Sequence, residues 1–428
     1  MATGDLPGLV RDAKFPPADR LLSPYATDIL TAAVAPEGGK VRQASVRLVD
    51  YYPGRNVYAS YDAVVEWPNR ASQEVLGVVA RYDSRTQGER VVDIDGIRAD
   101  VWRYPHDPYL PGLVDAVDGA FVEALLDELD LNRGAIGFDV RSYSPRNRAA
   151  VEVTSEPVSK KLVFRPGHGF AQPKRESILY LKILRPERAR ETYAAHTALE
   201  GVVPIASCVH ADLDRGILAI KALPGAPLWD CIVDGVHRPL DADELLDVLE
   251  RIKDVDLQQD SRMTATEACH LNMDTLKAVL PAQAGTLDRF RERLGEDAPQ
   301  PEITVHGDFH EVQLLVDDDG LSGLLDLDDV GRGYRVDDMA MLLGRLWAYA
   351  QTEQRRGDRV AAYFWSLLET WERHIDPVEL RRRIAAVNMN HALQPFRYQE
   401  HSWRARCAQG IARADALLTQ LLPEARAS

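Results

Sequence analysis

Cysteine is scarce in this sequence, and no two cysteines stand close together. The chain of 428 residues contains 4 cysteines, none of them in a CxxC pair. Disulfide frameworks and zinc knuckles need several cysteines at short spacing, so neither is expected. The thiols are interpreted as reduced, which predicts a cytoplasmic protein.

Long apolar runs and an excess of basic charge are also lacking. No window reaches the roughly 20 uncharged apolar residues that a membrane helix needs, and the first 20 residues contain no apolar signal core. Lys and Arg total 51 against 66 Asp and Glu, which gives a formal net charge of −15. An acidic surface repels nucleic acid and anionic membranes, so neither is an expected partner. It is compatible with a small cationic substrate, although surplus acid usually serves solubility alone.

The composition is that of a folded globular protein, with 45% hydrophobic and 27% charged residues, and the length predicts two or three structural units. In the N-terminal part, strand-like runs at 41–49 and 57–65 flank the turn Pro53–Asn56, which predicts a hairpin. A similar pattern of Val, Tyr, Arg and Asn recurs at 140–147, where a duplicated hairpin unit and a chance match both stay open. Between the two, an apolar stripe at 113–129 has helical spacing.

The pattern changes from residue 160 onward. Pro186 opens a helix that runs to about residue 199. The strand-like runs of this part are 161–164, 178–184, 202–210 and 216–222. A Pro/Gly-rich segment, Leu223–Pro227, is interpreted as a linker between two lobes. Beyond residue 240 the chain is mainly helical, with five segments of 3.6-residue period: 242–255, 276–294 (broken near Pro281), 336–351, 359–374 and 377–422 (split near Pro395).

Residues 302–327 are the exception and hold the densest set of chemical side chains. Asp308 lies in a loop before a strand, an acidic turn follows, and Asp326 stands after a second strand. Because a hairpin brings its two ends together, Asp308, Gln313 and Asp326 are expected to converge. Carboxylate and amide oxygens suit Mg²⁺ rather than zinc, and a second carboxylate can accept the proton of an attacking hydroxyl. This is the arrangement that a phosphoryl-transfer site requires.

The same segment resembles the catalytic and metal motifs of the aminoglycoside phosphotransferase and choline kinase-like family, whose members are relatives of the protein kinases. The motifs are His306-Gly307-Asp308, an amide five residues further on, and Leu325-Asp326 after the hairpin. Residues 180–183 resemble the family's strand with the nucleotide lysine, and residues 223–228 resemble its interlobe segment. The match spans about residues 136–428.

The resemblance implies roles for the residues of the catalytic segment. Asp308 would be the catalytic base, and Gln313 and Asp326 would hold Mg²⁺. The family usually has Asn at the position of Gln313, and the extra methylene requires the metal or the strand to shift. Asp328 is an accessory carboxylate with no assigned role, and Asp338 is expected to cap the next helix or to brace the loop.

The resemblance also implies how the nucleotide is held. Lys182 would contact the α- and β-phosphates of ATP or another nucleoside triphosphate, and Glu191 would pair with Lys182. The backbone at Lys221–Leu223 would receive the adenine edge. The chain lacks a GxGxxG loop, and residues 143–148 are the expected cover over the phosphates. There Arg146 and Arg148 would supply the charge that loop amides supply elsewhere.

Plainer interpretations stay open beside these. The acidic hairpin could be a solvated surface feature, and Lys182 could be an edge-strand lysine that discourages aggregation. Arg146 and Arg148 could be ordinary solvated charges. His306 and His310 are spaced like zinc ligands, but the HExxH order is absent, and Gly307 does not favour a helix.

The sequence therefore predicts an α+β, protein-kinase-like two-lobe fold. Residues 1–135 would form an N-terminal α+β extension, 136–225 a nucleotide-binding lobe and 226–428 a mainly helical lobe. The predicted reaction is ATP- and Mg²⁺-dependent phosphoryl transfer to a hydroxyl of a small molecule, with an aminoglycoside or amino sugar first. Neutral-sugar or choline-like alcohol kinases and a nucleotide-binding pseudokinase module are the alternatives. The oligomeric state is not predicted.

Overall fold

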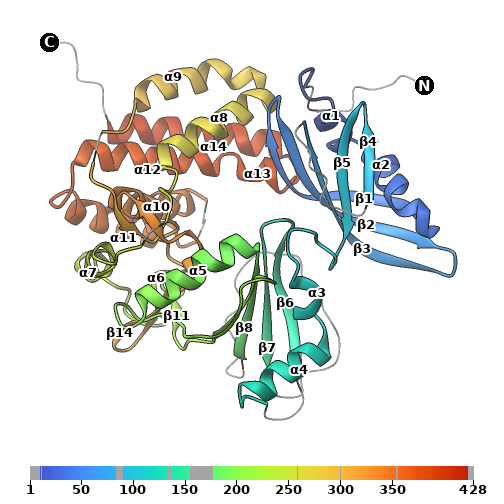
Figure 1. The fold of residues 1–428 in the computed structure, drawn as a ribbon. Coiled ribbons are helices and arrows are strands. Elements are labelled where there is room, and N and C mark those ends of the chain that lie inside the picture. The colour runs from blue at the N-terminus through green and yellow to red at the C-terminus, as the bar shows by residue number, and fades with distance from the viewer. Residues whose placement is uncertain are drawn as a thin grey trace.

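The computed structural model describes residues 10, 12–82, 90–132, 136–154, 177–257, 259–298, 300–352 and 355–422. Within them the chain forms an N-terminal sheet unit, a small lobe around a second sheet, and a mainly helical large lobe (Figure 1). This is the predicted two-lobe α+β fold with an additional N-terminal unit.

The N-terminal unit is a five-stranded antiparallel sheet with two helices, α1 (Pro17–Leu21) and α2 (Ala26–Val34). Its strands, in the spatial order β1-β2-β3-β5-β4, are β1 (Lys40–Tyr52), β2 (Asn56–Trp67), β3 (Arg70–Arg81), β5 (Ile97–Arg103) and β4 (Arg90–Ile94). The predicted first hairpin is confirmed, with Tyr52 opposite Asn56 across its turn. Gly54 in that turn has φ +70°, a conformation that glycine adopts without strain.

The small lobe is a second five-stranded antiparallel sheet flanked by helices. Its strands, in the order β6-β7-β8-β10-β9, are β6 (Gly137–Ser144), β7 (Arg148–Thr154), β8 (Ser177–Leu184), β10 (Ile217–Lys221) and β9 (Cys208–Asp212). Helix α5 (Pro186–Leu199) follows β8 and begins at its proline, as predicted. The strand expected at 202–210 begins only at Cys208, and the one expected at 161–164 lies outside the described residues.

The helix expected at 113–129 is two helices, α3 (Leu113–Ala116) and α4 (Gly119–Glu128). The chain breaks between them because Asp118 caps α4, accepting a hydrogen bond from the Ala120 N–H at 3.2 Å. The apolar residues of both helices belong to the same buried cluster as Val151 and Leu181 of the second sheet. These helices therefore pack with the small lobe. A division near residue 104 describes that packing better than one at residue 135.

Helices of the large lobe occupy all five segments of 3.6-residue period, and one further helix, the first of them, was not predicted. They are α6 (Leu228–Asp234), α7 (Ala242–Lys253), α8 (Ala265–Val279), α9 (Ala284–Leu294), α10 (Arg335–Ala350), α11 (Gly357–Trp371), α12 (Pro377–His391), α13 (Gln394–Arg397) and α14 (Trp403–Leu421). The breaks expected near Pro281 and Pro395 both occur, since proline removes a backbone donor and is tolerated only in a first turn. Helix α8 begins earlier than predicted, at Ala265, where Thr264 forms a capping box with Glu267.

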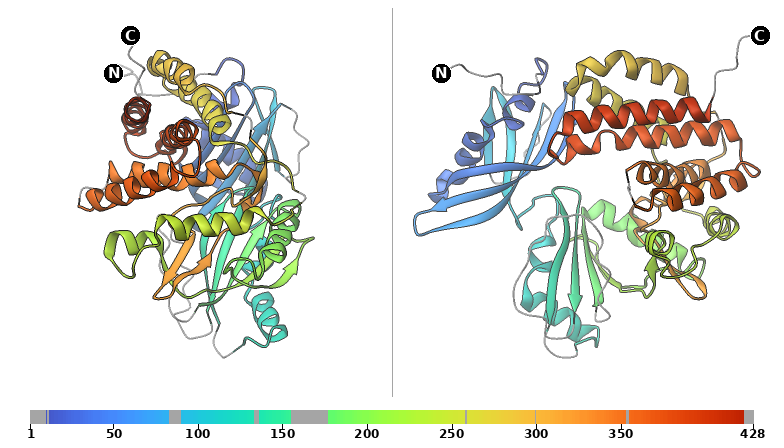
Figure 2. Two further views of the ribbon diagram at one scale, coloured as in Figure 1. Left: turned by 90° about the vertical axis from the view of Figure 1, so that its left-hand side faces the viewer. Right: turned by 180° about the vertical axis from the view of Figure 1, so that it is seen from behind.

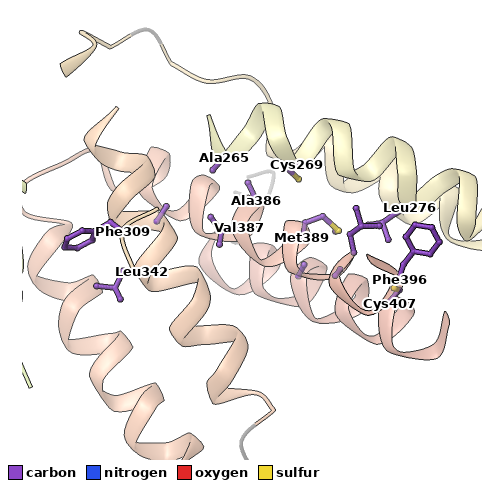
Figure 3. Packing of buried hydrophobic residues seen from close by; sticks show 14 of the residues in the cluster. Ala265, Cys269, Leu276, Phe309, Leu342, Ala386, Val387, Met389, Phe396 and Cys407 are labelled. Atoms are coloured by element: carbon purple, nitrogen blue, oxygen red, sulfur yellow. The ribbon is translucent and has the colours of Figure 1, made fainter. Parts of the chain in front are cut away.

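Buried apolar side chains join α8, α10, α12 and α14 into one core. Cys269 and Leu276 of α8 face Met389 of α12 and Cys407 of α14 (Figure 3). The buried thiols thus act as small apolar groups. Across the described residues, we find no helix with the length and apolar character to cross a membrane.

Candidate active site

The residues of the predicted catalytic segment meet at the open end of a hairpin. Strands β13 (Leu314–Asp317) and β14 (Gly320–Leu324) pair so that the Leu325 N–H donates to the Gln313 carbonyl oxygen at 2.8 Å. This pairing places the Gln313 amide nitrogen 3.3 Å from an Asp326 carboxylate oxygen. The backbone of Asp326 is left-handed, with φ +57°.

Asp308 approaches the same point from the loop before β13. His310 lies between the two, with its Nε2 atom 3.3 Å from the Asp308 carboxylate and 3.3 Å from the Gln313 amide nitrogen. Burial raises the pKa of Asp308, but the hydrogen bond from His310 and its charge outweigh burial and lower that pKa. Asp308 is therefore ionised at neutral pH and able to accept a proton. The expected convergence of Asp308, Gln313 and Asp326 is observed.

Lys182 of β8 reaches this cluster from the small lobe. Its Nζ atom lies 2.6 Å from Asp326 and 2.7 Å from Asp328. Arg148, the first residue of β7, lies 2.8 Å from Asp326 and 3.2 Å from Asp328. Burial opposes the charge on Asp326, but Lys182 and Arg148 outweigh it and hold the pKa of Asp326 below its ordinary value. Two cations of the small lobe thus face two carboxylates of the large lobe. Lys182 is therefore not the solvent-exposed edge-strand lysine of the alternative interpretation.

The partner predicted for Lys182 is wrong. Glu191 does not pair with Lys182 among the described residues; it pairs with Arg188, and Arg262 lies 3.8 Å away. Asp328 pairs with Lys182 instead, and Thr192 of α5 donates a hydrogen bond to Asp328 at 3.2 Å. Asp328, whose role the sequence left open, thus takes the place expected for Glu191.

The rotation of α5 about its axis explains this correction. Ala189, Thr192 and His196 are buried, at the spacing of one helix face, whereas Glu191 is half-buried one position away from that face. One residue along a helix rotates a side chain by about 100°. The run of small and polar residues at 189, 192 and 196 could have shown which face of α5 is buried.

The two arginines of the predicted phosphate cover point to different places. Arg148 lies in the carboxylate cluster, where it can meet phosphates. Arg146 stands in the turn between β6 and β7 with φ +69°, and its guanidinium carbon lies 3.8 Å from the ring centre of Tyr58. The Arg146 side chain therefore packs on the N-terminal unit rather than in the cluster.

The backbone predicted for adenine recognition lies at the end of β10. The Lys221 N–H donates to the Ser207 carbonyl oxygen at 3.0 Å, and the Ala222 N–H donates to Ile178 at 3.3 Å. The side chain of Lys221 is exposed, and Leu223 follows in the linker. A role of Lys221–Leu223 in nucleotide binding stays a prediction.

Asp338, near the start of α10, braces the catalytic loop. Its carboxylate accepts hydrogen bonds from the His306 N–H at 2.7 Å and the Gly307 N–H at 2.8 Å. Gly307 has φ +82°, and an added Cβ would lie 2.1 Å from the Asp329 carbonyl oxygen, so only glycine fits there. Of the two roles expected for Asp338, capping the next helix or bracing the loop, the structure shows the bracing role.

The buried carboxyl group of Asp338 should make the stability of the fold depend on pH. Burial raises its pKa to about 7, from an ordinary value of 3.8. Between these values the folded chain holds a proton that the unfolded chain has released, so this contribution to stability is complete below about pH 4 and is lost as pH rises to 7. We expect the unfolding free energy of the wild type to fall relative to that of Asp338→Asn over this range, by at most about 4 kcal/mol. Denaturant titrations at several pH values measure it, and parallel curves for the two proteins would contradict it.

The cluster can hold Mg²⁺ only with ligands from outside the protein. In the described part of the chain, no group of three or more His, Cys, Asp or Glu side chains is arranged for a metal. Asp326 offers a carboxylate, and Asp328 shares its partners Lys182 and Arg148. The Gln313 amide carries a further hard oxygen donor, although its nitrogen is the atom that faces Asp326 in the structure. This fits Mg²⁺, which commonly takes one or two carboxylates and completes its shell with phosphate oxygens and water. The histidine pair is not such a site, since His306 Nε2 lies 2.9 Å from the Leu325 carbonyl oxygen.

A cavity of about 460 Å³ lies away from this cluster. It is lined by the C-terminal half of α5, residues 200, 201 and 203–208, and Arg251 of α7. None of Asp308, Lys182, Gln313 or Asp326 lines it, so it is not the site of the proposed chemistry.

Lys182 of the small lobe faces Asp326 and Asp328 of the large lobe, with Asp308 nearby, which is the arrangement that the sequence predicts for a kinase-like phosphotransferase. Residues 175–375 match the model of a phosphotransferase enzyme family, which confirms the resemblance for that part of the chain. None of the curated proteins matches the chain.

Several solved structures are similar at low identity. A thermostable mutant of aminoglycoside phosphotransferase APH(4)-Ia, in a ternary complex with AMP-PNP and hygromycin B, is 15% identical, covers 72% of this chain and 99% of its own, and has a TM-score of 0.43. A GDP and kanamycin complex of an APH(2")-type enzyme is 12% identical, with coverages of 69% and 98% and a TM-score of 0.44. A macrolide 2'-phosphotransferase from Brachybacterium faecium is 14% identical, with coverages of 68% and 98% and a TM-score of 0.41.

Proposed function

We propose that this protein transfers the γ-phosphoryl group of ATP, with Mg²⁺, to a hydroxyl of a small molecule. The observation that carries the proposal is the cluster in which Lys182 and Arg148 face Asp326 and Asp328, with Gln313 3.3 Å from Asp326. The match of residues 175–375 to a phosphotransferase family supports it.

Each side chain of the cluster has a distinct task in this reaction. Asp308 orients the acceptor hydroxyl and takes its proton, because it is ionised and 30% exposed beside the cluster. Lys182 and Arg148 bind the phosphates and neutralise part of their negative charge. Bound Mg²⁺, held by Gln313 and Asp326, would neutralise charge on the phosphates.

For the acceptor, we propose an aminoglycoside or amino sugar. The chain carries a net charge of −15, and an acidic surface attracts a cationic polyol and raises its local concentration. The electrostatic attraction weakens with salt, so the apparent affinity for a cationic acceptor falls as ionic strength rises.

A panel of acceptors tests this function. Purified protein is incubated with ATP and Mg²⁺ and with aminoglycosides, amino sugars, neutral sugars, choline-like alcohols and macrolides in turn, and ADP release is measured. ADP release stimulated by an aminoglycoside or amino sugar supports the proposal. If only a neutral sugar or a choline-like alcohol stimulates ADP release, the acceptor belongs to that class and not to the aminoglycosides or amino sugars. Tight ATP binding without ADP release with any acceptor would favour a pseudokinase module.

A further inference from the structure

The N-terminal unit lies on the side of the molecule opposite the interlobe linker and touches both lobes. Figure 1 shows its sheet beside the ends of α8 and α13 and next to the small lobe, while β11 (Ala226–Pro227) lies on the far side. The view from behind in Figure 2 shows the same arrangement. The β1–β2 hairpin contacts both lobes, and Val75 of β3 and Trp102 of β5 add contacts to the small lobe.

Toward the large lobe, the hairpin is held by polar and aromatic contacts. Asp50 of β1 forms an ion pair with Arg397 of α13 at 2.6 Å. The Tyr51 carbonyl oxygen accepts a hydrogen bond from Thr275 of α8 at 3.0 Å, and the Tyr51 ring centre lies 6.5 Å from that of Phe396. Asp50 and Tyr51 are adjacent on one strand, so β1 is fixed to two different helices of the large lobe.

Toward the small lobe, the hairpin contacts the turn between β6 and β7. Tyr58 of β2 stacks under the Arg146 guanidinium, 3.8 Å from its carbon atom. From the other side, the buried carboxylate of Asp107 accepts hydrogen bonds from the Arg146 N–H at 2.8 Å and the Tyr143 hydroxyl at 2.9 Å. The left-handed backbone of Arg146 is thus held at both its side chain and its N–H.

This turn leads directly to the active site. Arg148 is two residues after Arg146 and begins β7, and its guanidinium lies 2.8 Å from Asp326. A shift of the turn therefore moves the group that we assign to the phosphates. The contact between Tyr58 and Arg146 links that turn to a unit anchored on the large lobe. A second link comes from Trp102 of β5, whose indole N–H donates a hydrogen bond to the Tyr143 hydroxyl at 3.1 Å.

We propose that Tyr58 is a positioning residue for the phosphate-facing turn. It holds Arg146 by its ring, and the anchored β1–β2 hairpin thereby sets where Arg148 meets the nucleotide. The inference rests on the proposed function, since it assigns Arg148 to the phosphates. It gives the N-terminal unit a part in nucleotide binding without a residue in direct contact with the substrate.

Hydrogen exchange and nucleotide affinity test this proposal with two variants. Tyr58→Leu removes the aromatic face, and Tyr58→Phe keeps it. For Tyr58→Leu we expect amides of residues 143–148 to exchange faster and the Kd for ATP with Mg²⁺ to rise, each by about 2- to 30-fold, which is the range of a cation–π contact. Tyr58→Phe should match the wild type in both measurements.

A control separates positioning from loss of stability. Val92→Ala on β4 weakens the same N-terminal unit away from the turn and should leave exchange at residues 143–148 unchanged. Unchanged exchange in Tyr58→Leu, or equally fast exchange in Tyr58→Phe or Val92→Ala, overturns the proposal. The exchange measurement needs no nucleotide, so wild-type protein that binds no ATP would overturn the proposed function while exchange still decides whether Tyr58 holds the turn.

Discussion

Replacing Asp308 with alanine is expected to lower turnover by about 10²–10⁴-fold, the usual loss when a general base is removed. Of the three carboxylates Asp308, Asp326 and Asp328, Asp308 is the one that neither Lys182 nor Arg148 contacts, so it can act on an acceptor hydroxyl. ATP affinity should stay close to that of the wild type, because the expected phosphate contacts come from Lys182 and Arg148. Steady-state kinetics with the acceptor found by the panel, together with an ATP titration, measure both quantities.

Asp308→Asn separates the loss of the proton acceptor from the loss of side-chain size. It keeps the size of the side chain and a hydrogen-bond acceptor for His310 but cannot take a proton, so it should lose about as much turnover as alanine. Near-normal turnover in either variant, with every acceptor, would refute the assignment of Asp308.

Asp326→Asn should be the second most damaging change. It removes the charge that faces Lys182 and Arg148 and that would hold Mg²⁺, while asparagine still tolerates the left-handed backbone at this position. We expect turnover to fall by about 10²–10³-fold, as when a group that stabilises transition-state charge is lost. We also expect the Mg²⁺ concentration for half-maximal activity to rise. Kinetics over a range of Mg²⁺ concentrations measure both.

Asp319→Asn provides the control for this change. Asp319 is exposed in the turn at the other end of the same hairpin, so the same change of charge occurs there without a contact to the cluster. Its Mg²⁺ dependence should match the wild type. A Mg²⁺ dependence in Asp326→Asn equal to that of Asp319→Asn would remove Asp326 from the metal site.

The convergence of the catalytic segment was predictable because it is local. Gln313 and Asp326 are separated by one hairpin, and strand alternation with a short turn is enough to place the ends of that hairpin together. The expectation that Lys182 meets them came from the family resemblance, because β8 and the hairpin belong to different lobes and no local rule relates them.

The pairing of Glu191 was not predictable from the same information. Pro186 and the helical run establish that α5 exists, but they do not determine its rotation about its axis, and the packed face places Thr192 rather than Glu191 toward Asp328. The prediction of a single helix over 113–129 was wrong for another reason. The apolar spacing continues through Asp118, and the capping interaction of that residue outweighs it locally.

The contacts of the N-terminal unit with the two lobes could not be predicted from the sequence. Tyr58 and Arg146 are 88 positions apart, one in the first sheet and the other in a turn of the second, and neither residue type by itself indicates a partner. Alternation did predict that β1 and β2 form a hairpin, but not which lobe each of its faces would meet.

The left-handed backbone of Asp326 has a consequence for which residues this position can accept. Aspartate, asparagine and glycine enter that conformation at low cost, whereas a longer side chain pays more to do so. Glutamate would therefore preserve the negative charge but not the bend of the chain, and asparagine the bend but not the charge. The two requirements coincide in aspartate alone, so the apparently mild exchange of one acid for the other is not a conservative one here.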